Sequence, residues 1–310
     1  MESVGALRIL KDKTILVTGA TGFLAKIFVE KILRIQPNVK KLYLLVRAED
    51  TQSAMKRVQN EIVEKDLFRV VRETCGANLE PFISEKVASV AGDVSLLNLG
   101  IKDSEVMEKM LTEIDLVINF AATTNFDERY DVALNTNTMG ALHVLNFAKK
   151  CVNITMLLHV STAYVCGERS GIIPENPFYS GETLRRTCEL VINAEKKLIE
   201  KQLNQLRAEN ATEKEAISTM QDLGIRRARL YGWPNTYAFT KAMGEMLLGN
   251  FRDDLPLVIT RPTMVTSTYS EPFPGWIEGV RTIDGPILCY VKGKLKFFYG
   301  NPDTILDLVS

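Results

Sequence analysis

A long apolar run, an excess of charge of either sign and a metal-ligand pattern are all missing from this sequence of 310 residues. No segment carries about 18 consecutive apolar residues, the length that a membrane-spanning helix needs, so we expect no transmembrane helix. The formal net charge is +0, which gives no electrostatic reason to expect nucleic acid as a partner. The 2 histidines and 5 cysteines form no C-x-x-C pair and no zinc-like spacing, so we expect no bound metal.

Signals for secretion and for a disulfide framework are missing as well. The first residues, Met-Glu-Ser-Val-Gly-Ala-Leu-Arg, contain no apolar signal core. The cysteines lack the dense spacing of disulfide-rich secreted domains, so we interpret them as reduced thiols. These features predict a protein that is not secreted and that lies on the cytoplasmic side of the cell.

What the sequence does contain is an alternation of apolar strands and helical stretches. Continuous apolar strands separated by helices are typical of a parallel sheet that is covered on both faces. We therefore predict an α/β fold with a doubly wound parallel sheet of the Rossmann type. The strands are expected at 14–18, 42–46, 87–91, 116–119, 156–161 and 257–261, and the helices at 23–35, 132–151 and 237–250, with a charged helical region at about 51–72.

A glycine-containing turn follows the first predicted strand. Thr18-Gly-Ala-Thr-Gly22 comes directly after Ile15-Leu-Val17 and opens the next helix. Gly19 permits a tight turn, and Gly22 lets the backbone approach a phosphate, while the unpaired N–H groups of the helix face the pyrophosphate. Glycines after a strand can also form a plain connection, but the strand–turn–helix context favours a dinucleotide site.

The ends of the next three strands carry further candidates for cofactor contacts. Arg47 ends the second strand, where an acidic residue would read the ribose hydroxyls of NAD, so it favours the 2′-phosphate of NADPH. Asp93 and Val94 follow the third strand and could meet the adenine edge. Asn119-Phe-Ala-Ala122 offers small residues for a close approach. The alternative for each of these sites is that it is an ordinary polar strand end, which faces solvent and binds no cofactor.

A phenol, an ammonium and a hydroxyl supply the candidate chemistry. Tyr237 and Lys241 stand four residues apart on a predicted helix, and Thr162 closes the fifth strand. We expect Tyr237 to donate a proton, with its pKa lowered by Lys241, which could also hold the nicotinamide ribose. Thr162 would stabilise charge on a substrate carbonyl oxygen. No Ser-His-Asp pattern recruits His143 or His159, which we interpret as structural.

These segments resemble the extended short-chain dehydrogenases/reductases and, more closely, the plant type of alcohol-forming fatty acyl-CoA reductases. The specific matches are Thr18-Gly-Ala-Thr-Gly-Phe-Leu-Ala-Lys26, Asn119-Phe-Ala-Ala-Thr-Thr-Asn-Phe-Asp127 and Tyr237-Ala-Phe-Thr-Lys-Ala-Met-Gly-Glu245. The resemblance implies that Thr162, Tyr237 and Lys241 are catalytic. It implies that the cofactor is lined by Gly19, Thr21, Gly22, Phe23, Leu24, Arg47, Asp93, Ala121, Lys241 and Pro262. Cys166 departs from the tyrosine of the broader V-Y-G motif.

The same resemblance implies the activity. It predicts NADPH-dependent reduction of a long-chain fatty acyl-CoA to a primary alcohol with release of CoA, as in the synthesis of wax and suberin lipids. A reductase of another carbonyl, such as a nucleotide sugar or a flavonoid ketone, is one alternative, and a truncated inactive paralogue that binds partners is another. Peripheral membrane contact and association with the endoplasmic reticulum are left open.

We expect 1–310 to form one reductase domain, in which 10–167 and 235–265 make the NADP-binding Rossmann core. An insertion at 168–234 is expected to contain a helix at about 183–209, either as a plain surface helix or as a cover for substrate. The remainder, 266–310, would be a substrate-side region with a helix near 276–290 and a strand at 295–299. The resemblance implies that a helical C-terminal domain, which family members carry, is absent here, so we expect poor turnover of long acyl-CoAs or none.

Overall fold

The structure is a computed structural model and describes residues 8–169, 171–185, 189–280, 283–301 and 303–310. The chain divides into two compact units, Met1–Arg261 and Pro262–Ser310. Among the residues that the structure describes, no helix is both long and apolar enough to cross a bilayer.

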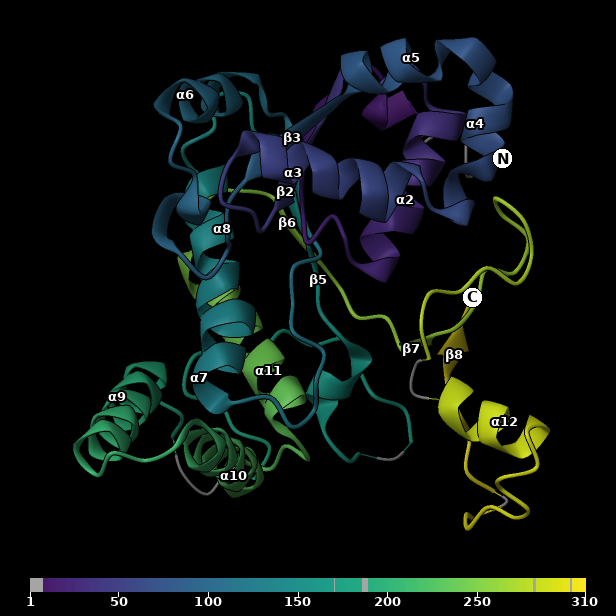
Figure 1. The fold of residues 1–310 in the computed structure, drawn as a ribbon. Coiled ribbons are helices and arrows are strands. Elements are labelled where there is room, and N and C mark those ends of the chain that lie inside the picture. Colours follow the sequence, from purple (N-terminus) through teal and green to yellow (C-terminus); the bar gives the residue numbers. More distant parts are fainter. Residues whose placement is uncertain (1–7, 170, 186–188, 281–282, 302) are drawn as a thin grey trace. The chain divides into compact units, whose positions relative to one another are not determined.

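The larger unit is built around a parallel sheet of six strands in the order β3-β2-β1-β4-β5-β6 (Figure 1). The chain reverses its direction of travel across the sheet between β1 and β4, and this is the switch point at which doubly wound folds bind ligands. The predicted fold class is therefore confirmed. The strands are β1 (Thr14–Thr18), β2 (Lys41–Val46), β3 (Val87–Ala91), β4 (Leu116–Asn119), β5 (Met156–Val160) and β6 (Leu257–Thr260).

Helices connect these strands and cover both faces of the sheet (Figure 1). Two of the connections contain a π-helical turn, at Gln59–Val63 and at Leu134–Met139, where a regular helix had been predicted. The α-helices of the larger unit are α2 (Phe23–Ile35), α3 (Thr51–Val58), α4 (Arg69–Cys75), α5 (Leu79–Lys86), α6 (Ser104–Glu113), α7 (Tyr130–Ala133), α8 (Gly140–Ala148), α9 (Ile192–Ala208), α10 (Glu213–Tyr231) and α11 (Thr236–Phe251).

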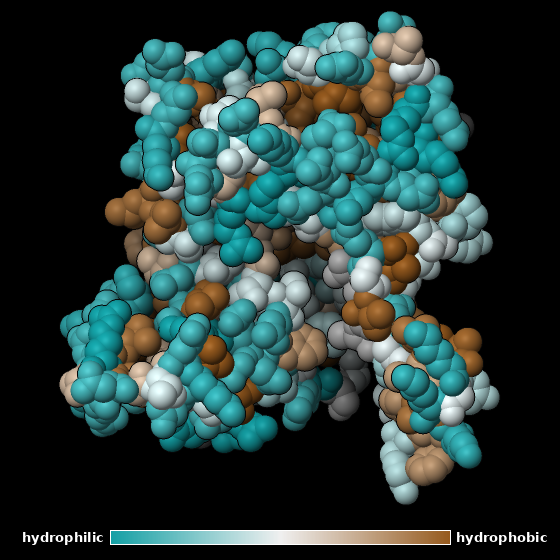
Figure 2. Space-filling model, in the orientation of Figure 1, coloured by the Kyte–Doolittle hydropathy of each residue, from teal (hydrophilic) through white to brown (hydrophobic). Residues whose placement is uncertain are grey.

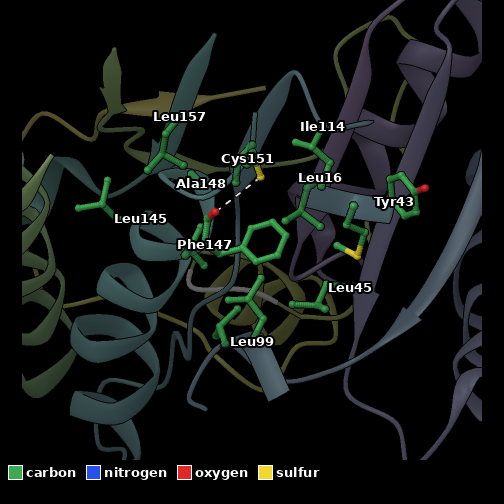
Figure 3. Packing of buried hydrophobic residues seen from close by; sticks show 14 of the residues in the cluster. Leu16, Tyr43, Leu45, Leu99, Ile114, Leu145, Phe147, Ala148, Cys151 and Leu157 are labelled. Atoms are coloured by element: carbon green, nitrogen blue, oxygen red, sulfur yellow. Dashed lines mark hydrogen bonds between the residues drawn. The ribbon is translucent and has the colours of Figure 1, made fainter. Parts of the chain in front are cut away.

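The core lies on both sides of β1 because every residue of that strand is buried. Side chains of a strand alternate between the two faces, so a strand without an exposed residue must be covered twice. On one face Leu16 joins a cluster with Tyr43, Phe147 and Leu157, from three further elements (Figure 3). The phenol of Tyr43 reaches the edge of this cluster and donates a hydrogen bond of 2.7 Å to Glu113.

Among the described residues of the insertion between β5 and α11 there are two α-helices, α9 and α10, rather than the single predicted one. The first part of the predicted helix is wrong, because α9 begins only at Ile192 and Gly181 pairs with Leu190 in an isolated bridge; Cys188 lies outside the described residues. The second helix, α10, was not predicted. It begins with a capping box in which Thr212 and Glu215 exchange hydrogen bonds. Both helices show mainly hydrophilic side chains in Figure 2.

A buried carboxylate fastens this insertion to α7 within the larger unit. Glu195 of α9 is 1% exposed and forms an ion pair with Arg227 of α10, at 2.9 Å from Nε. It also accepts hydrogen bonds from the phenols of Tyr130, at 2.9 Å, and Tyr231, at 3.0 Å. Three helices therefore meet at one carboxylate that has a partner for each oxygen.

We expect Glu195→Ala to lower the free energy of unfolding by about 3 kcal/mol, because it leaves Arg227 and two buried phenols without their acceptor. Asp66→Ala is the control, since its pair with Arg69 is exposed and 3.7 Å long; it should cost less than about 1 kcal/mol. Urea unfolding of both variants measures the difference. Equal costs would show that the Glu195 cluster does not hold the insertion.

Among its described residues, the smaller unit holds two short parallel strands, β7 (Met264–Val265) and β8 (Leu308–Val309), and one helix, α12 (Asp284–Val291). A loop between them is closed by Thr268, whose hydroxyl donates to the carbonyl of Phe273 at 2.7 Å and accepts from the amide of Trp276 at 2.9 Å. The predicted helix near 276–290 is found later, at α12. The predicted strand at 295–299 is wrong, since these residues are irregular and Phe297, Phe298 and Tyr299 are exposed.

Candidate active site

The turn between β1 and α2 has the geometry of a phosphate site. Gly19 has a φ of +64°, and a Cβ placed there would lie 2.7 Å from the backbone N and Cα of Ala121. A side chain is therefore excluded by both conformation and space. Gly22 stands before α2 without any side-chain cap, and the first turn of α2 holds no acidic residue. A helix start without an acidic residue or a capping side chain favours an anionic ligand, so the turn fits a dinucleotide pyrophosphate.

A cleft of about 460 Å³ opens beside this turn. Seven of the predicted cofactor residues line it, which are Gly19, Thr21, Gly22, Arg47, Asp93, Val94 and Ala121. Phe23 and Leu24 do not line it: they lie in the first turn of α2, and Phe23 is 6% exposed. Pro262 belongs to the smaller unit. The structure thus brings together most of the residues predicted from the ends of β1 to β4.

The cleft contains a second arginine that the sequence analysis missed. Arg57, on α3, lines the same cleft and donates a hydrogen bond of 2.6 Å from Nη1 to the backbone carbonyl of Arg47. Its Nη2 also pairs with Glu61 at 2.9 Å, which raises the pKa of the guanidinium. Two cations therefore lie at the end of β2. Arg57 is ten residues after Arg47 and lies on the next helix, α3, so the sequence alone does not show that the two arginines are neighbours. The packing of α3 brings the Arg57 side chain to the same cleft.

Local signals fix the start of α11 and therefore the place of Tyr237. Helix α10 stops at Gly232, which has a φ of +102°. The indole of the buried Trp233 donates to the carbonyl of Val165 at 2.8 Å, which ties this junction to the 3-10 turn Ala163–Cys166 that follows β5. Asn235 then caps α11, because its side-chain oxygen accepts from the amide of Ala238 at 2.8 Å.

Tyr237 and Thr162 meet although they lie 75 residues apart in this sequence. The Thr162 side chain lies close enough to the Tyr237 phenol to act on its pKa, and the Tyr237 ring packs against Phe126 with 5.9 Å between ring centroids. Burial raises the pKa of Tyr237, and the hydroxyl of Thr162 opposes that rise. The expected lowering of the phenol pKa by Lys241 is wrong in this structure, because Lys241 points its ammonium at β5 instead.

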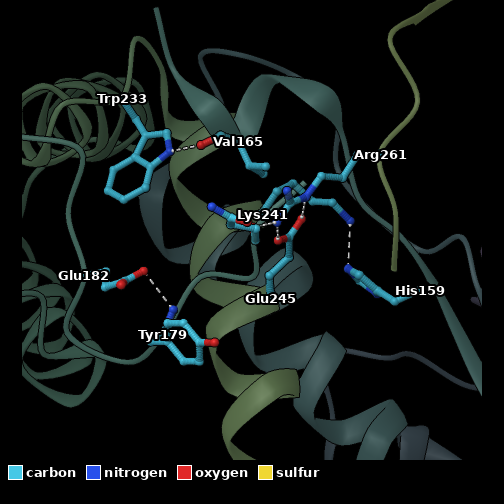
Figure 4. Close-up of polar contacts among 9 residues, drawn as sticks. His159, Val165, Tyr179, Glu182, Trp233, Lys241, Glu245 and Arg261 are labelled. Atoms are coloured by element: carbon cyan, nitrogen blue, oxygen red, sulfur yellow. Dashed lines mark hydrogen bonds and ion pairs between the residues drawn. The ribbon is translucent and has the colours of Figure 1, made fainter. Parts of the chain in front are cut away.

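Lys241 is 1% exposed and is held by β5, which ends two residues before Thr162 (Figure 4). Its Nζ donates to the carbonyl of Val160 at 2.7 Å and lies 3.3 Å from Nε2 of His159. Burial lowers the pKa of Lys241 to about 8, and the charge of Glu245 partly offsets that effect. His159, interpreted above as structural, is thus a direct neighbour of a predicted catalytic residue.

A π-helical turn connects the cofactor cleft to α11. Asn137, in the turn Leu134–Met139, accepts from the amide of Thr123 at 2.9 Å and donates to the Thr240 hydroxyl at 3.0 Å. Thr123 lines the cleft, and Thr240 is the residue before Lys241. π-Helical turns often occur at functional sites. Here the turn places the side-chain amide of Asn137 between Thr123 and α11, so that it hydrogen-bonds to both. The sequence analysis missed Asn137 because a regular helical period was assumed.

A separate cavity of about 670 Å³ lies between the segment 175–180, the second half of α11 and β6. Phe178, Tyr179, Glu245 and Arg261 are among its lining residues. Glu245 stands eight residues after Tyr237, or roughly 12 Å along the helix, so this cavity is not where the phenol acts. Glu245 and Arg261 form a buried ion pair there, with Nε 3.1 Å from Oε1.

Residues 17–310 match the family described as male sterility protein, an NAD-binding family. The chain belongs to this family. It carries a nicotinamide-binding domain, in agreement with the turn and the cleft. It is 60% identical over 304 residues to "Probable fatty acyl-CoA reductase 4" of Arabidopsis thaliana, covering 98% of this chain and 62% of that protein. It is 57% identical over 310 residues to "Alcohol-forming fatty acyl-CoA reductase" of Simmondsia chinensis, covering 100% and 63%.

The predicted resemblance to plant fatty acyl-CoA reductases is confirmed by these identities, and the chain spans just over three fifths of the length of these relatives. Solved structures share the fold. The reductase domain of a nonribosomal peptide synthetase from Mycobacterium tuberculosis is 22% identical with a TM-score of 0.53, covering 83% of this chain and 49% of that one. A UDP-glucuronic acid 4-epimerase from Bacillus cereus is 16% identical with a TM-score of 0.53, covering 95% and 68%.

Proposed function

We propose that this chain reduces a long-chain fatty acyl-CoA to a primary alcohol with NADPH and releases CoA as the thiol. The observation that carries the proposal is the meeting of Tyr237 with Thr162 beside the buried Lys241, in a chain that is 57% identical to an alcohol-forming fatty acyl-CoA reductase. The cleft with its glycine turn supports a dinucleotide as the reductant.

The chain's own residues would bind, orient and protonate. Reduction to the alcohol needs two hydrides, one from each of two NADPH molecules bound in turn: the first would go to the thioester carbonyl, after which CoA leaves as the thiol, and the second to the resulting aldehyde. Thr162 would donate a hydrogen bond to the carbonyl oxygen while charge develops on it. Tyr237 would give its proton to that oxygen, and its raised pKa keeps the phenol protonated until the oxygen becomes basic.

The test is incubation of the protein with NADPH and a panel of acyl-CoAs of different chain lengths. We expect free CoA thiol to appear with oxidation of NADPH, and a primary alcohol as the final product. NADPH oxidation with a nucleotide sugar or a flavonoid ketone, without thiol release, would support the other carbonyl reductase. Cofactor binding without any turnover would support an inactive paralogue.

The preference for NADPH over NADH is proposed from the two arginines at the end of β2. We expect Arg47→Ala to weaken NADPH binding by roughly 10- to 100-fold while NADH binding changes little, because a charge-assisted bond to phosphate contributes about 1.5–3 kcal/mol. Fluorescence titration with both cofactors measures the change. Arg69→Ala, on α4 and paired with Asp66, is the control and should alter neither affinity. Equal weakening of both cofactors would remove Arg47 as the phosphate-reading residue.

We also propose a cytoplasmic-side location in a reducing compartment. Support comes from Cys75, Cys151, Cys166 and Cys289, which are free thiols among the residues that the structure describes. Burial raises the pKa of Cys151 to about 12, which keeps that thiol protonated and unreactive. A fluorescent fusion imaged together with an endoplasmic reticulum marker would test the location and the membrane association that was left open.

A further inference from the structure

A line of buried polar side chains joins Lys241 to the turn that holds the dinucleotide. Nε2 of His159 lies 3.3 Å from Nζ of Lys241, and Nδ1 lies 3.0 Å from Nδ2 of Asn119. Oδ1 of Asn119 in turn accepts from the Thr18 hydroxyl at 2.6 Å, and that hydroxyl accepts from the amide of Ala121 at 3.3 Å. The exposures of the four side chains, from Lys241 to Thr18, are 1%, 1%, 2% and 0%.

Two arrangements of donors and acceptors fit the contacts that join Lys241, His159 and Asn119. A charged lysine has no lone pair, so it must donate to Nε2, and the ring proton then sits on Nδ1 and requires an oxygen of Asn119. A neutral lysine can accept from Nε2–H, and Nδ1 then accepts from the amide nitrogen of Asn119. The amide oxygen and nitrogen are almost equal in size, so a rotation of Asn119 exchanges the two arrangements. The proton on Lys241 therefore selects the tautomer of His159.

The burial of Lys241 brings the change between these two hydrogen-bond arrangements close to neutral pH. Burial holds the pKa of Lys241 at about 8, so both of its protonation states are accessible under ordinary conditions. Glu245 faces Lys241 from the next turn of α11 and opposes that shift, and its own charge is paired with Arg261 of the chain following β6. Burial and the charge of Lys241 hold the pKa of His159 well below its usual value. The ring thus stays neutral and responds by tautomer alone.

We propose that His159 is a positioning residue for Lys241, whose ring tautomer follows the protonation of that lysine and, through Asn119, sets the direction of hydrogen bonding at Thr18 beside the dinucleotide turn. When Lys241 is charged, Asn119 offers its nitrogen to Thr18; when Lys241 is neutral, Thr18 donates to the oxygen. The ammonium of Lys241 and the backbone of the cofactor turn are thereby coupled. The importance of Lys241 rests on the proposed function, whereas the coupling itself does not require turnover.

The experiment uses ¹⁵N-histidine labelling of the whole chain without substrate. The sequence has 2 histidines, so each ring gives its own signals. His143 is an internal reference, because its Nδ1 lies 2.9 Å from the carbonyl of Val94, which can only accept, and this contact fixes the proton on Nδ1. Long-range ¹H–¹⁵N spectra distinguish the two tautomers between pH 7 and 10. We expect His159 to change from Nδ1–H to Nε2–H with a midpoint near pH 8.

The control is Lys241→Met, in which His159 should keep one tautomer across the whole range while the His143 signals confirm folding. Lys241→Gln serves the same purpose if the methionine variant does not fold. A parent protein whose His159 keeps one tautomer from pH 7 to 10 would overturn the proposal, and so would a change of tautomer that persists in the lysine variants. A lysine-dependent change in a protein that reduces no acyl-CoA would support the coupling and refute the proposed function.

Discussion

Tyr237→Phe is expected to abolish turnover while leaving the affinity for NADPH within a few-fold of the parent protein. The substitution removes the phenolic hydroxyl that lies near Thr162, and with it the proton donor. General acid catalysis contributes roughly 10²- to 10⁴-fold, so kcat should fall by at least that lower value. The phenylalanine ring keeps the packing against Phe126, so the site should retain its shape. Steady-state kinetics and a fluorescence titration with NADPH measure the two quantities.

Tyr130→Phe is the matched control for this substitution. It also removes a buried phenolic hydroxyl, but this one donates to Glu195 at 2.9 Å, in the cluster that holds the insertion. We expect it to cost about 1 kcal/mol of stability and to leave kcat unchanged. A Tyr237→Phe protein that turns over at the parent rate would rule out the phenol as the acid.

The sequence pattern predicted the bounds of a helix or strand correctly where the residues of that element determine its structure by themselves. The strand Thr14–Thr18 and the helix Phe23–Ile35 have the predicted bounds. The signals that define them, which are an apolar run, a glycine turn and apolar residues at helical spacing, all lie within a few residues of one another in the sequence. The cofactor residues at the strand ends followed from the same reasoning, since the carboxyl ends of parallel strands share one edge. This part of the candidate site needed no knowledge of distant contacts.

The prediction of secondary structure failed where contacts with residues far away in the sequence determine the structure. Gly224 interrupts the helical pattern of α10, but a Cβ there would lie 2.7 Å from the Thr236 hydroxyl, so the glycine permits close packing against the start of α11. The strand expected at 295–299 has apolar residues but pairs with no strand among the described residues, and unpaired backbone does not form a stable strand. A local window contains neither kind of information.

The same limit applies to His159. On β5 it shares a face with Leu157 and is as buried as an apolar residue, so its position predicts only a core side chain. Its contacts with Lys241 and Asn119 depend on how α11 and β4 lie against β5, since these residues are 82 and 40 positions away. A buried histidine between a lysine and an amide is recognised only once the sheet order is known.

Gly19→Ala is expected to remove most of the affinity for the cofactor and to destabilise the fold. The new Cβ would lie 2.7 Å from the backbone N and Cα of Ala121, which cannot move without shifting the end of β4. The turn must move instead, and the N–H groups at the start of α2 move with it. We expect a loss of NADPH affinity of about 100-fold, close to 3 kcal/mol, because the donors no longer converge on the pyrophosphate.

Gly76→Ala separates backbone strain from steric overlap. Gly76 also has a positive φ, of +52°, but no atom lies within 4 Å of the position that a Cβ would take. Gly76→Ala should lose only the free energy of backbone strain, roughly 1–3 kcal/mol of unfolding free energy, and should bind NADPH as the parent protein does. Gly19→Ala should lose a further 1–3 kcal/mol or so from overlap. If both variants lose the same stability and both bind NADPH as the parent does, the contact between the turn and Ala121 does not shape the cofactor site.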